Sequence, residues 1–426
     1  MSKKSPQLRF EGFTDDWEER KLGEIGSFKN GMNFGKDAMG HGSPFVNLQN
    51  IFGKNIVDDT TLELAESTEK QKVEYSLIKG DVLFIRSSVK PSGVGEAALV
   101  DSNLPDTTYS GFIIRFRPKI DIDNNFKRFA FGTKYVRNQI MARATSSANT
   151  NINQDSLSLI QVGLPNLSEQ KKIGSFFKLL DDTIALHQRK LDLLKEQKKG
   201  YLQKMFPKNG AKVPELRFAG FADDWEERKF DECFNFPVST NSLSRALLNY
   251  DEGDIQSVHY GDILIKYPAI LNVKNDKIPY ITDSSFEKYK SNLLENGDLI
   301  FADAAEDETV GKAVEVNGLT EENLVAGLHT IVARSKDKKA EFFLGYYINS
   351  NTYHRQLLRL IQGSKVSSIS KGNLQKTLVS FPKDFEEQQK IGAFFKKIDD
   401  TLALHQRKLD LLKEQKKGFL QTMFAK

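Results

Sequence analysis

The chain has 426 residues, of which 39% are hydrophobic and 28% are charged, and its formal net charge at pH 7 is +4. No apolar run approaches the roughly 20 residues that span a bilayer, and no apolar stretch follows the basic N-terminal residues, so we expect neither a membrane protein nor a secretory signal. The single cysteine, Cys233, excludes an internal disulfide and a cysteine-based zinc cluster, which predicts a cytoplasmic protein.

The chain contains two copies of one framework. Residues 8–28 return as 216–236, and residues 169–206 return as 387–424, in near-identical sequence. Two copies are too few for a solenoid, and each is long enough to hold its own core. We therefore predict an N-terminal domain at 1–167, a central helix at 168–206, a linker at 207–215, a C-terminal domain at 216–385 and a C-terminal helix at 386–426.

The sequence between the repeated ends predicts a mixed α+β fold in both copies. In the first copy, strand-like runs occur at 44–48, 80–86 and 111–117, and helical spacing occurs at 126–141. In the second copy, the corresponding strands are expected at 279–282, 297–301 and 327–334, and the helix at 340–361. The two domains are therefore expected to share a fold and to differ in surface.

One part of the first domain is rich in basic residues. Residues 107–168 contain no glutamate and three aspartates, against eight basic residues: Arg115, Arg117, Lys119, Lys127, Arg128, Lys134, Arg137 and Arg143. A local basic surface of this kind binds phosphate backbones. The alternative is a solvated surface that happens to lack acidic residues.

Each long helix carries a heptad seam, in which apolar residues recur at steps of four and three. The seam residues are Ile173, Phe177, Leu180, Ile184, His187, Leu191 and Leu194 in the first copy, and Ile391, Phe395, Ile398, Leu402, His405, Leu409 and Leu412 in the second. We expect the two helices to pair along these seams as an antiparallel coiled coil, roughly 55 Å long. Such a pair would set the distance between the domains and give the chain an internal two-fold pseudo-symmetry.

Polar residues interrupt both seams. His187 and His405 lack companions at metal-ligand spacing, so we assign them a packing or register role in preference to a metal site. Lys198 and Lys416 are expected to lay their stems along the apolar face and to keep their ammonium groups in water.

Each helix also has a pair of neighbouring aspartates, Asp181 with Asp182 and Asp399 with Asp400. Consecutive helical residues point in different directions, so we interpret all four as solvated surface. A divalent metal site is the alternative.

Several repeated segments together carry a family resemblance. They are the openings WEERKLGEI and WEERKFDEC, the Gly-Asp-aliphatic-Phe strands, the Leu-Pro and Phe-Pro before EQKKI and EQQKI, and the helical HQRKLDLLKEQKKGYLQ. The chain resembles, over essentially its whole length, the specificity subunit of bacterial type I restriction-modification enzymes. In that family each variable region is a target recognition domain for one half of a bipartite DNA site, and the conserved helices space the halves and dock methylation subunits. The resemblance implies two methylation and two restriction subunits as partners, with S-adenosylmethionine, ATP and Mg on those subunits.

Polar loops beside the predicted strands are the candidate DNA contacts. In the first domain they contain Arg86, Ser88, Lys90, Arg143, Ser146, Asn149 and Asn151, and in the second Asp303, Glu306, Asp307, Gln362, Ser364, Lys365 and Ser367. Guanidinium, hydroxyl and amide groups pair with base edges or phosphates, and a carboxylate accepts a hydrogen bond from cytosine N4. Any one of these residues could equally be ordinary solvated loop.

No catalytic motif is evident in the sequence. It lacks the Asn/Asp-Pro-Pro-Tyr segment of amino-methyltransferases, the phosphate loop of an ATP-driven motor and a carboxylate or histidine cluster for metal-assisted hydrolysis. We therefore predict a non-catalytic DNA-recognition subunit. One alternative is a scaffold that holds two protein-binding domains on a coiled coil and has no salt-sensitive affinity for DNA. A self-contained nuclease or methyltransferase is the other.

Overall fold

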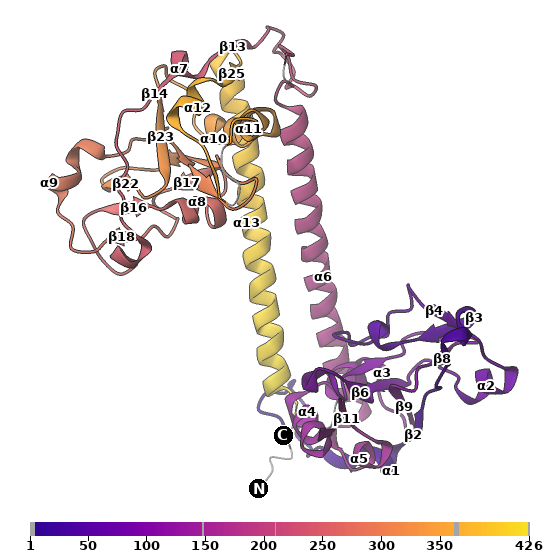
Figure 1. The fold of residues 1–426 in the computed structure, drawn as a ribbon. Coiled ribbons are helices and arrows are strands. Elements are labelled where there is room, and N and C mark those ends of the chain that lie inside the picture. The colour runs from indigo at the N-terminus through magenta and orange to yellow at the C-terminus, as the bar shows by residue number, and fades with distance from the viewer. Residues whose placement is uncertain (1–4, 147–148, 209, 362–365, 425–426) are drawn as a thin grey trace. The chain divides into compact units, whose positions relative to one another are not determined.

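The chain folds into two compact units. The computed structural model describes residues 5–146, 149–208, 210–361 and 366–424. One unit comprises Met1–Gln188 and Arg407–Lys426, and the other comprises Arg189–Gln406. Each unit therefore consists of one globular domain and one segment from each of the two long helices (Figure 1).

The first domain is built on an antiparallel sheet with the order β2 (Gly26–Asn30), β9 (Ile113–Pro118), β5 (Val82–Ile85) and β7 (Ala97–Leu99). All four residues of β5 are buried. Its alternate side chains enter two different apolar clusters, one on each face of the sheet. A strand covered on both faces is an unbroken apolar run, which is why this segment is recognisable in the sequence.

Smaller elements surround this sheet. A second sheet has the order β4 (Glu63–Ala65), β3 (Met39–Val46) and β8 (Thr108–Tyr109), and β1 (Glu18–Lys21) pairs with β12 (Gln161–Leu164). The helices of this domain are α1 (Leu22–Ile25), α2 (Glu69–Glu74), α3 (Asn124–Ala130), α4 (Lys134–Arg143) and α5 (Gln154–Ser158).

The second domain repeats the main sheet and extends it. The order is β14 (Phe234–Asn235), β23 (Thr330–Ser335), β19 (Leu299–Ala302), β21 (Ala313–Asn317) and β17 (Ile270–Asn272), with β17 added parallel to β21. A second sheet has the order β15 (Leu248–Asn249), β18 (Tyr280–Ile281), β16 (Gln256–Val258) and β22 (Leu324–Ala326), and β13 (Glu226–Lys229) pairs with β25 (Leu378–Phe381). The helices are α7 (Phe230–Cys233), α8 (Tyr260–Ile265), α9 (Phe286–Tyr289), α10 (Phe343–Ile348), α11 (Asn351–Leu358) and α12 (Lys371–Gln375).

The predicted mixed α/β fold and all six predicted strands are confirmed, but each predicted domain helix is two helices. The run at 126–141 divides into α3 and α4, and the run at 340–361 divides into α10 and α11. The side chains of Thr133 and Ser350 accept hydrogen bonds from the first-turn amides of α4 and α11. A capping hydroxyl starts a new helix even where apolar periodicity continues.

The two predicted long helices are confirmed as α6 (Leu167–Lys204) and α13 (Phe385–Thr422), each of 38 residues and about 57 Å long. In the first unit, the Phe176 and Phe419 rings lie 5.1 Å apart and Lys416 pairs with Asp181 at 2.5 Å. The later residue of α6, Asp181, meets the earlier residue of α13, Lys416, so the two segments run antiparallel. Every residue of the predicted seams is buried or half-buried.

The second unit contains the equivalent antiparallel contact. The Tyr201 and Phe394 rings lie 5.0 Å apart, and Lys198 pairs with Asp399 at 2.5 Å. The hydroxyl of Tyr346 also donates a hydrogen bond to Asp399 at 2.9 Å. Helix pairing is therefore built twice, from the same residue types.

These ion pairs correct two predictions. Asp181 and Asp399 are not solvated, because their side chains are only 16% and 14% exposed. Lys198 and Lys416 do not hold their ammonium groups in water, because those groups form the ion pairs. The domain surfaces that cover the helices here are distant in sequence, so the helical pattern could not reveal them. Asp182 and Asp400 are exposed, as predicted.

A buried ion pair closes each repeat. The Nε and Nη2 atoms of Arg9 donate to the carboxylate of Glu169 at 2.8 and 2.7 Å. The same two atoms of Arg217 donate to the carboxylate of Glu387 at 2.7 and 2.8 Å. The two glutamates lie in the first turns of α6 and α13 and have no exposed surface. Each pair ties the opening segment of a repeat to the start of the helix that ends it.

The aspartate of each repeated Gly-Asp strand is also structural. Asp81 accepts two hydrogen bonds from Arg117, and Asp298 accepts two from Arg334. Both carboxylates are 1% exposed. The repeated Gly-Asp therefore fixes one strand of the main sheet to its neighbour.

The two aspartates in the middle of α6 provide a matched test of the buried helix contact. Asp181 forms ion pairs with both Arg128 and Lys416, whereas Asp182 is 58% exposed and forms an ion pair with the exposed Lys178. We expect Asp181→Asn to lower the free energy of unfolding of the first unit by about 2 kcal/mol, less than for a fully buried pair because some solvent reaches the site. Asp182→Asn should cost less than about 0.5 kcal/mol.

Urea unfolding followed by tryptophan fluorescence measures both variants. Each unit has one tryptophan, Trp17 or Trp225, so a Trp225→Phe background restricts the signal to the first unit. Equal effects of the two substitutions would contradict the assignment of Asp181 to a buried ion pair.

Candidate nucleic-acid interface

Short strand pairing brings the two predicted contact loops of the first domain together. β6 (Ser87–Ser88) pairs antiparallel with β11 (Thr150–Asn151), which pairs in turn with β10 (Thr145–Ser146). The segment that follows β5 and the segment that follows α4 therefore meet in one small sheet (Figure 1). The predicted contact residues of this domain lie in or beside that sheet.

The basic side chains at this sheet differ in exposure. Lys90 is exposed, and so is Arg143, whose Nη1 donates to the carbonyl of Gln139 at 3.2 Å. Arg86 is half-buried and uses one nitrogen, Nη1, to donate to the carbonyl of Gly111 at 3.2 Å. Among the described residues, the Nε and Nη2 donors of Arg86 have no hydrogen-bond partner.

The uncharged residues are more enclosed. Ser88 is 8% exposed, which leaves its hydroxyl little access to a large ligand. Asn151 is half-buried and donates to the carbonyl of Asn149 at 2.8 Å. Ser146 belongs to β10, and its side chain lies outside what the structure describes.

The second domain joins its two loops in the same way. β20 (Ala304–Ala305) pairs antiparallel with β24 (Ser367–Ser368), which places the half-buried Ser367 opposite Ala305. Three further predicted contact residues lie outside the described residues: Gln362, Ser364 and Lys365. The strand pairing thus brings together the loops that the sequence indicated in both domains.

The loop after β19 is acidic. Glu306 and Asp307 are exposed, while Asp303 is half-buried and its side chain is 26% exposed. Burial raises the pKa of Asp303. Hydrogen bonds donated by Thr309 hold the pKa of Asp307 below its usual range. This loop therefore offers acceptors, whereas the corresponding loop of the first domain offers donors.

Arg86 and Asp303 occupy equivalent backbone positions, each directly after the Gly-Asp strand. The amide of Arg86 donates to the carbonyl of Phe112 at 2.7 Å, and the amide of Asp303 donates to that of His329 at 3.0 Å. The carbonyls of both residues accept an amide from the partner loop at 2.9 Å. The same backbone site thus presents a cation in one domain and an anion in the other.

Two exposed rings next to these positions were missed by the sequence reasoning. Phe112 is 54% exposed, and the side chain of His329 is 52% exposed. The Nδ1 atom of His329 lies 3.2 Å from Oδ1 of Asp303, and the backbone of His329 is left-handed, with φ of 54°. Both residues fall within predicted strands, where rings are normally assigned to the core. The sequence signal for them was their shared position near the start of the third predicted strand of each domain.

The expected basic surface at 107–168 is wrong for most of its members. Five of the eight basic side chains are buried or half-buried and donate to carboxylates or backbone carbonyls within the unit: Arg115, Arg117, Lys127, Arg128 and Arg137. Lys127 is 4% exposed, and burial lowers its pKa to about 8. The three that remain exposed are Lys119, Lys134 and Arg143.

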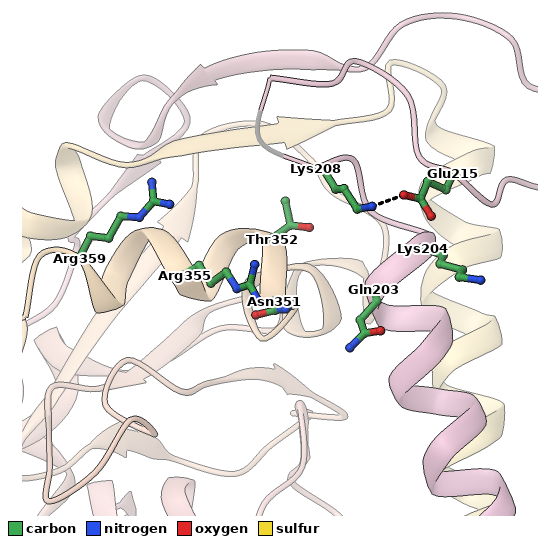
Figure 2. A pocket seen from close by; sticks show the side chains of 8 residues that line it. All are labelled: Gln203, Lys204, Lys208, Glu215, Asn351, Thr352, Arg355 and Arg359. Atoms are coloured by element: carbon green, nitrogen blue, oxygen red, sulfur yellow. Dashed lines mark hydrogen bonds and ion pairs between the residues drawn. The ribbon is translucent and has the colours of Figure 1, made fainter.

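The second unit contains a basic hollow of about 530 Å³ between the end of α6 and α11. Figure 2 shows its lining, which consists of Gln203, Lys204, Lys208, Glu215, Asn351, Thr352, Arg355 and Arg359. Lys208 pairs with Glu215, while Lys204, Arg355 and Arg359 have no ion-pair partner among the described residues. Three cationic groups therefore remain available at this surface.

The described residues contain neither a metal-binding cluster nor a membrane-spanning helix. Within the described ranges, no group of three or more histidine, cysteine, aspartate or glutamate side chains could hold a metal ion. None of the helices described combines the length and apolar character needed to cross a bilayer.

Comparisons with known proteins agree with the repeated architecture. A family model described as the type I restriction modification DNA specificity domain matches residues 14–196 and again 222–414. The "Putative type I restriction enzyme MjaX specificity subunit" of Methanocaldococcus jannaschii is 24% identical, and the alignment covers 96% of this chain and 93% of that protein. The type I restriction enzyme MjaVIII specificity subunit of the same archaeon is 22% identical over 62% of this chain and 61% of its own.

Solved structures are similar in fold. The crystal structure of a type I restriction-modification S subunit from M. genitalium matches with a TM-score of 0.59 and 14% identity, and the match covers 99% of both chains. A structure from work on complex assembly of the type I R-M system matches with a TM-score of 0.52 and 17% identity over 95% of this chain and 96% of that one. At these identities the likeness establishes the fold.

Proposed function

The chain belongs to the type I restriction-modification specificity subunits, with one DNA specificity domain matched in each repeat, and we propose that each domain reads one half of an asymmetric, bipartite DNA site. The observation that carries this proposal is the repeated frame with unlike loops. The two specificity subunits of Methanocaldococcus jannaschii are archaeal, so membership of the family does not imply a bacterial source. A protein-interaction scaffold without DNA is not favoured, because both domains match a DNA specificity family.

The difference between the domains determines the kind of site. Two identical readers related by a two-fold axis favour a palindromic site. Here the exposed loop after the Gly-Asp strand is basic in the first domain and acidic in the second. Two different half-sites follow, separated by a spacer that neither domain reads. We expect the length of the spacer to depend on the length of α6 and α13, which have 38 residues each, because these helices connect the two domains.

Exchange of one domain tests this division of labour. Replacement of residues 37–164 by the matching region of another specificity subunit should change one half-site and leave the other half-site and the spacer unchanged. Sequencing of adenine methylation in cells that carry the assembled complex reads out all three. A change in both half-sites would contradict the proposal that each domain reads independently.

The long helices also carry apolar residues outside the seam. On α6, Leu179, Leu186 and Leu193 recur every seven residues and are 66%, 50% and 59% exposed. On α13, Leu404 and Leu411 are 62% and 57% exposed at the same spacing. A heptad stripe of exposed leucine is the surface that another amphipathic helix covers. We assign these stripes to helical segments of the methylation subunits, two of which would bind because the stripe is repeated.

Substitution of these leucines tests the assignment. Burial of one leucine contributes about 1.5–3 kcal/mol, so Leu186→Gln and Leu404→Gln should each weaken binding of a methylation subunit by about tenfold or more. The folding of the isolated chain should not change, because both side chains are exposed. Lys190→Gln and Lys408→Gln, at exposed positions four residues further along each helix, are the controls. Equal effects of the leucine and lysine substitutions in a pull-down titration would overturn the assignment.

Catalysis is assigned to the partners. Among the described residues, the buried carboxylates accept hydrogen bonds from arginine side chains or, for Glu315, from backbone amides. S-adenosylmethionine is therefore expected on the methylation subunits, and ATP and Mg²⁺ on two restriction subunits. The chain would direct adenine methylation or restriction to a sequence and would not itself perform either reaction.

The basic hollow suits a phosphate of the DNA backbone. Arg355 lies in α11, and Arg359, four residues further on, caps that helix in right-handed helical conformation, so the two exposed side chains lie on one face. Gln139 and Gln356 make equivalent bonds to β12 and β25, which aligns α4 with α11, and the first domain has asparagine and alanine where the two arginines lie. The arginines would offset the repulsion between phosphates and the acidic loop of this domain.

If the two arginines bind phosphates of the DNA backbone, their removal should weaken the salt dependence of DNA binding and leave sequence specificity unchanged. Arg355→Gln with Arg359→Gln should reduce the slope of log affinity against log salt concentration by about 1 for each phosphate that the arginines neutralise, equally for all DNA sequences. Lys195→Gln with Lys199→Gln, exposed on α6, is the control for a change in net charge. An unchanged slope in the arginine variant, or an equal change in the control, would contradict this role.

A further inference from the structure

The position directly after the Gly-Asp strand carries opposite charges in the two domains, and this difference has a consequence for the bases that are read. We propose that Arg86 reads a guanine in one half-site and that Asp303 reads a cytosine in the other. The proposal rests on the proposed function and makes it specific. In the major groove, guanine offers two acceptors, O6 and N7, whereas cytosine offers the N4 donor. A donor-only side chain and an acceptor-only side chain at one backbone site therefore select opposite bases.

Asp303 has the properties of a base reader. Its carboxylate is only 26% exposed, and Oδ1 is engaged by His329 at 3.2 Å. The remaining oxygen, Oδ2, has no hydrogen-bond partner among the described residues and can accept one bond from a ligand. The ring of His329 is itself held by an edge contact with Tyr260, whose ring centroid lies 5.3 Å away. The carboxylate is thus positioned before DNA arrives, which lowers the entropy that binding must remove.

The strained backbone of His329 supports the same assignment. A histidine with φ of 54° occupies the left-handed region, which side-chain-bearing residues seldom adopt. Such strain persists where the surroundings hold it and is concentrated at functional sites. In the first domain the equivalent residue is Phe112, an exposed ring at the same distance along the strand. Each domain therefore presents one charged group beside one ring.

A phosphate contact does not explain Asp303. The DNA backbone repels a carboxylate, so an acidic residue in the interface is stabilised only by donors on the base edges. Cytosine N4 fits better than adenine N6, because adenine places the N7 acceptor beside its amino group. Arg86 can contact either a phosphate or a guanine. The position of Arg86 favours guanine, because this half-buried side chain occupies the site where the other domain has Asp303. Its Nε and Nη2 donors match the two guanine acceptors.

Binding selection with the complete complex of this chain and its methylation subunits tests the proposal. DNA libraries are randomised at each half-site position, and relative affinities for the four bases are measured position by position. The wild type should prefer cytosine at one position of one half-site and guanine at one position of the other, each by roughly 5- to 150-fold. Asp303→Asn should remove the cytosine preference alone, and Arg86→Gln the guanine preference alone. Arg86→Lys should retain guanine, because lysine also donates to O6 and N7.

The matched controls are Glu306→Gln and Lys90→Gln, which remove an exposed charge from the same two loops. They should change affinity for all sequences by one common factor. The proposal is overturned if Asp303→Asn alters no position, alters both half-sites, or alters a position that does not specify cytosine. A wild-type complex without any bipartite preference would instead refute the proposed function. Unchanged fluorescence of Trp17 and Trp225 verifies that each variant is folded.

Discussion

A buried arginine–glutamate pair holds each repeat of the chain closed. Arg9 with Glu169, and Arg217 with Glu387, connect the opening segment of a repeat to the first turn of the helix that ends it. An unpaired carboxylate buried at this depth would cost several kcal/mol, so neither member of a pair can change alone. The next residue in each helix, Gln170 or Gln388, hydrogen-bonds to the globular domain as well. These paired contacts explain why the same arginine, glutamate and glutamine stand at these positions in both repeats.

The sequence between the ends is under a different constraint. Its main sheet needs buried apolar strands and one Asp–Arg pair, but the loops that follow the strands need only to reach one another through two short strands. That arrangement lets the side chains at one backbone site change completely. Arg86 and Asp303 are the clearest example, because their backbones form the same hydrogen bonds while their side chains carry opposite charges. A rigid frame with interchangeable loops is a physical basis for reading different half-sites with one fold.

Much of this organisation could be predicted from the sequence, because it depends on local pattern. The strand predicted at 80–86 contains the unbroken apolar run Val82–Ile85, and the helix seams repeat at heptad spacing. The predictions that were wrong depended on contacts between distant segments. The ion pair of Asp181 with Lys416, and the internal bonds of Arg115, Lys127 and Arg137, join residues whose proximity no periodicity reveals. The exposed rings were missed because aromatic residues in strands usually belong to the core.

In the proposed function, this chain alone determines which DNA sequence is modified. Single-molecule sequencing of adenine methylation tests it most directly, in cells that express the methylation subunits with this chain and in matched cells that lack only this chain. We expect a bipartite, asymmetric motif that is methylated in the first cells and unmethylated in the second. Methylation of the same sequences in both, with active methylation subunits, would contradict it.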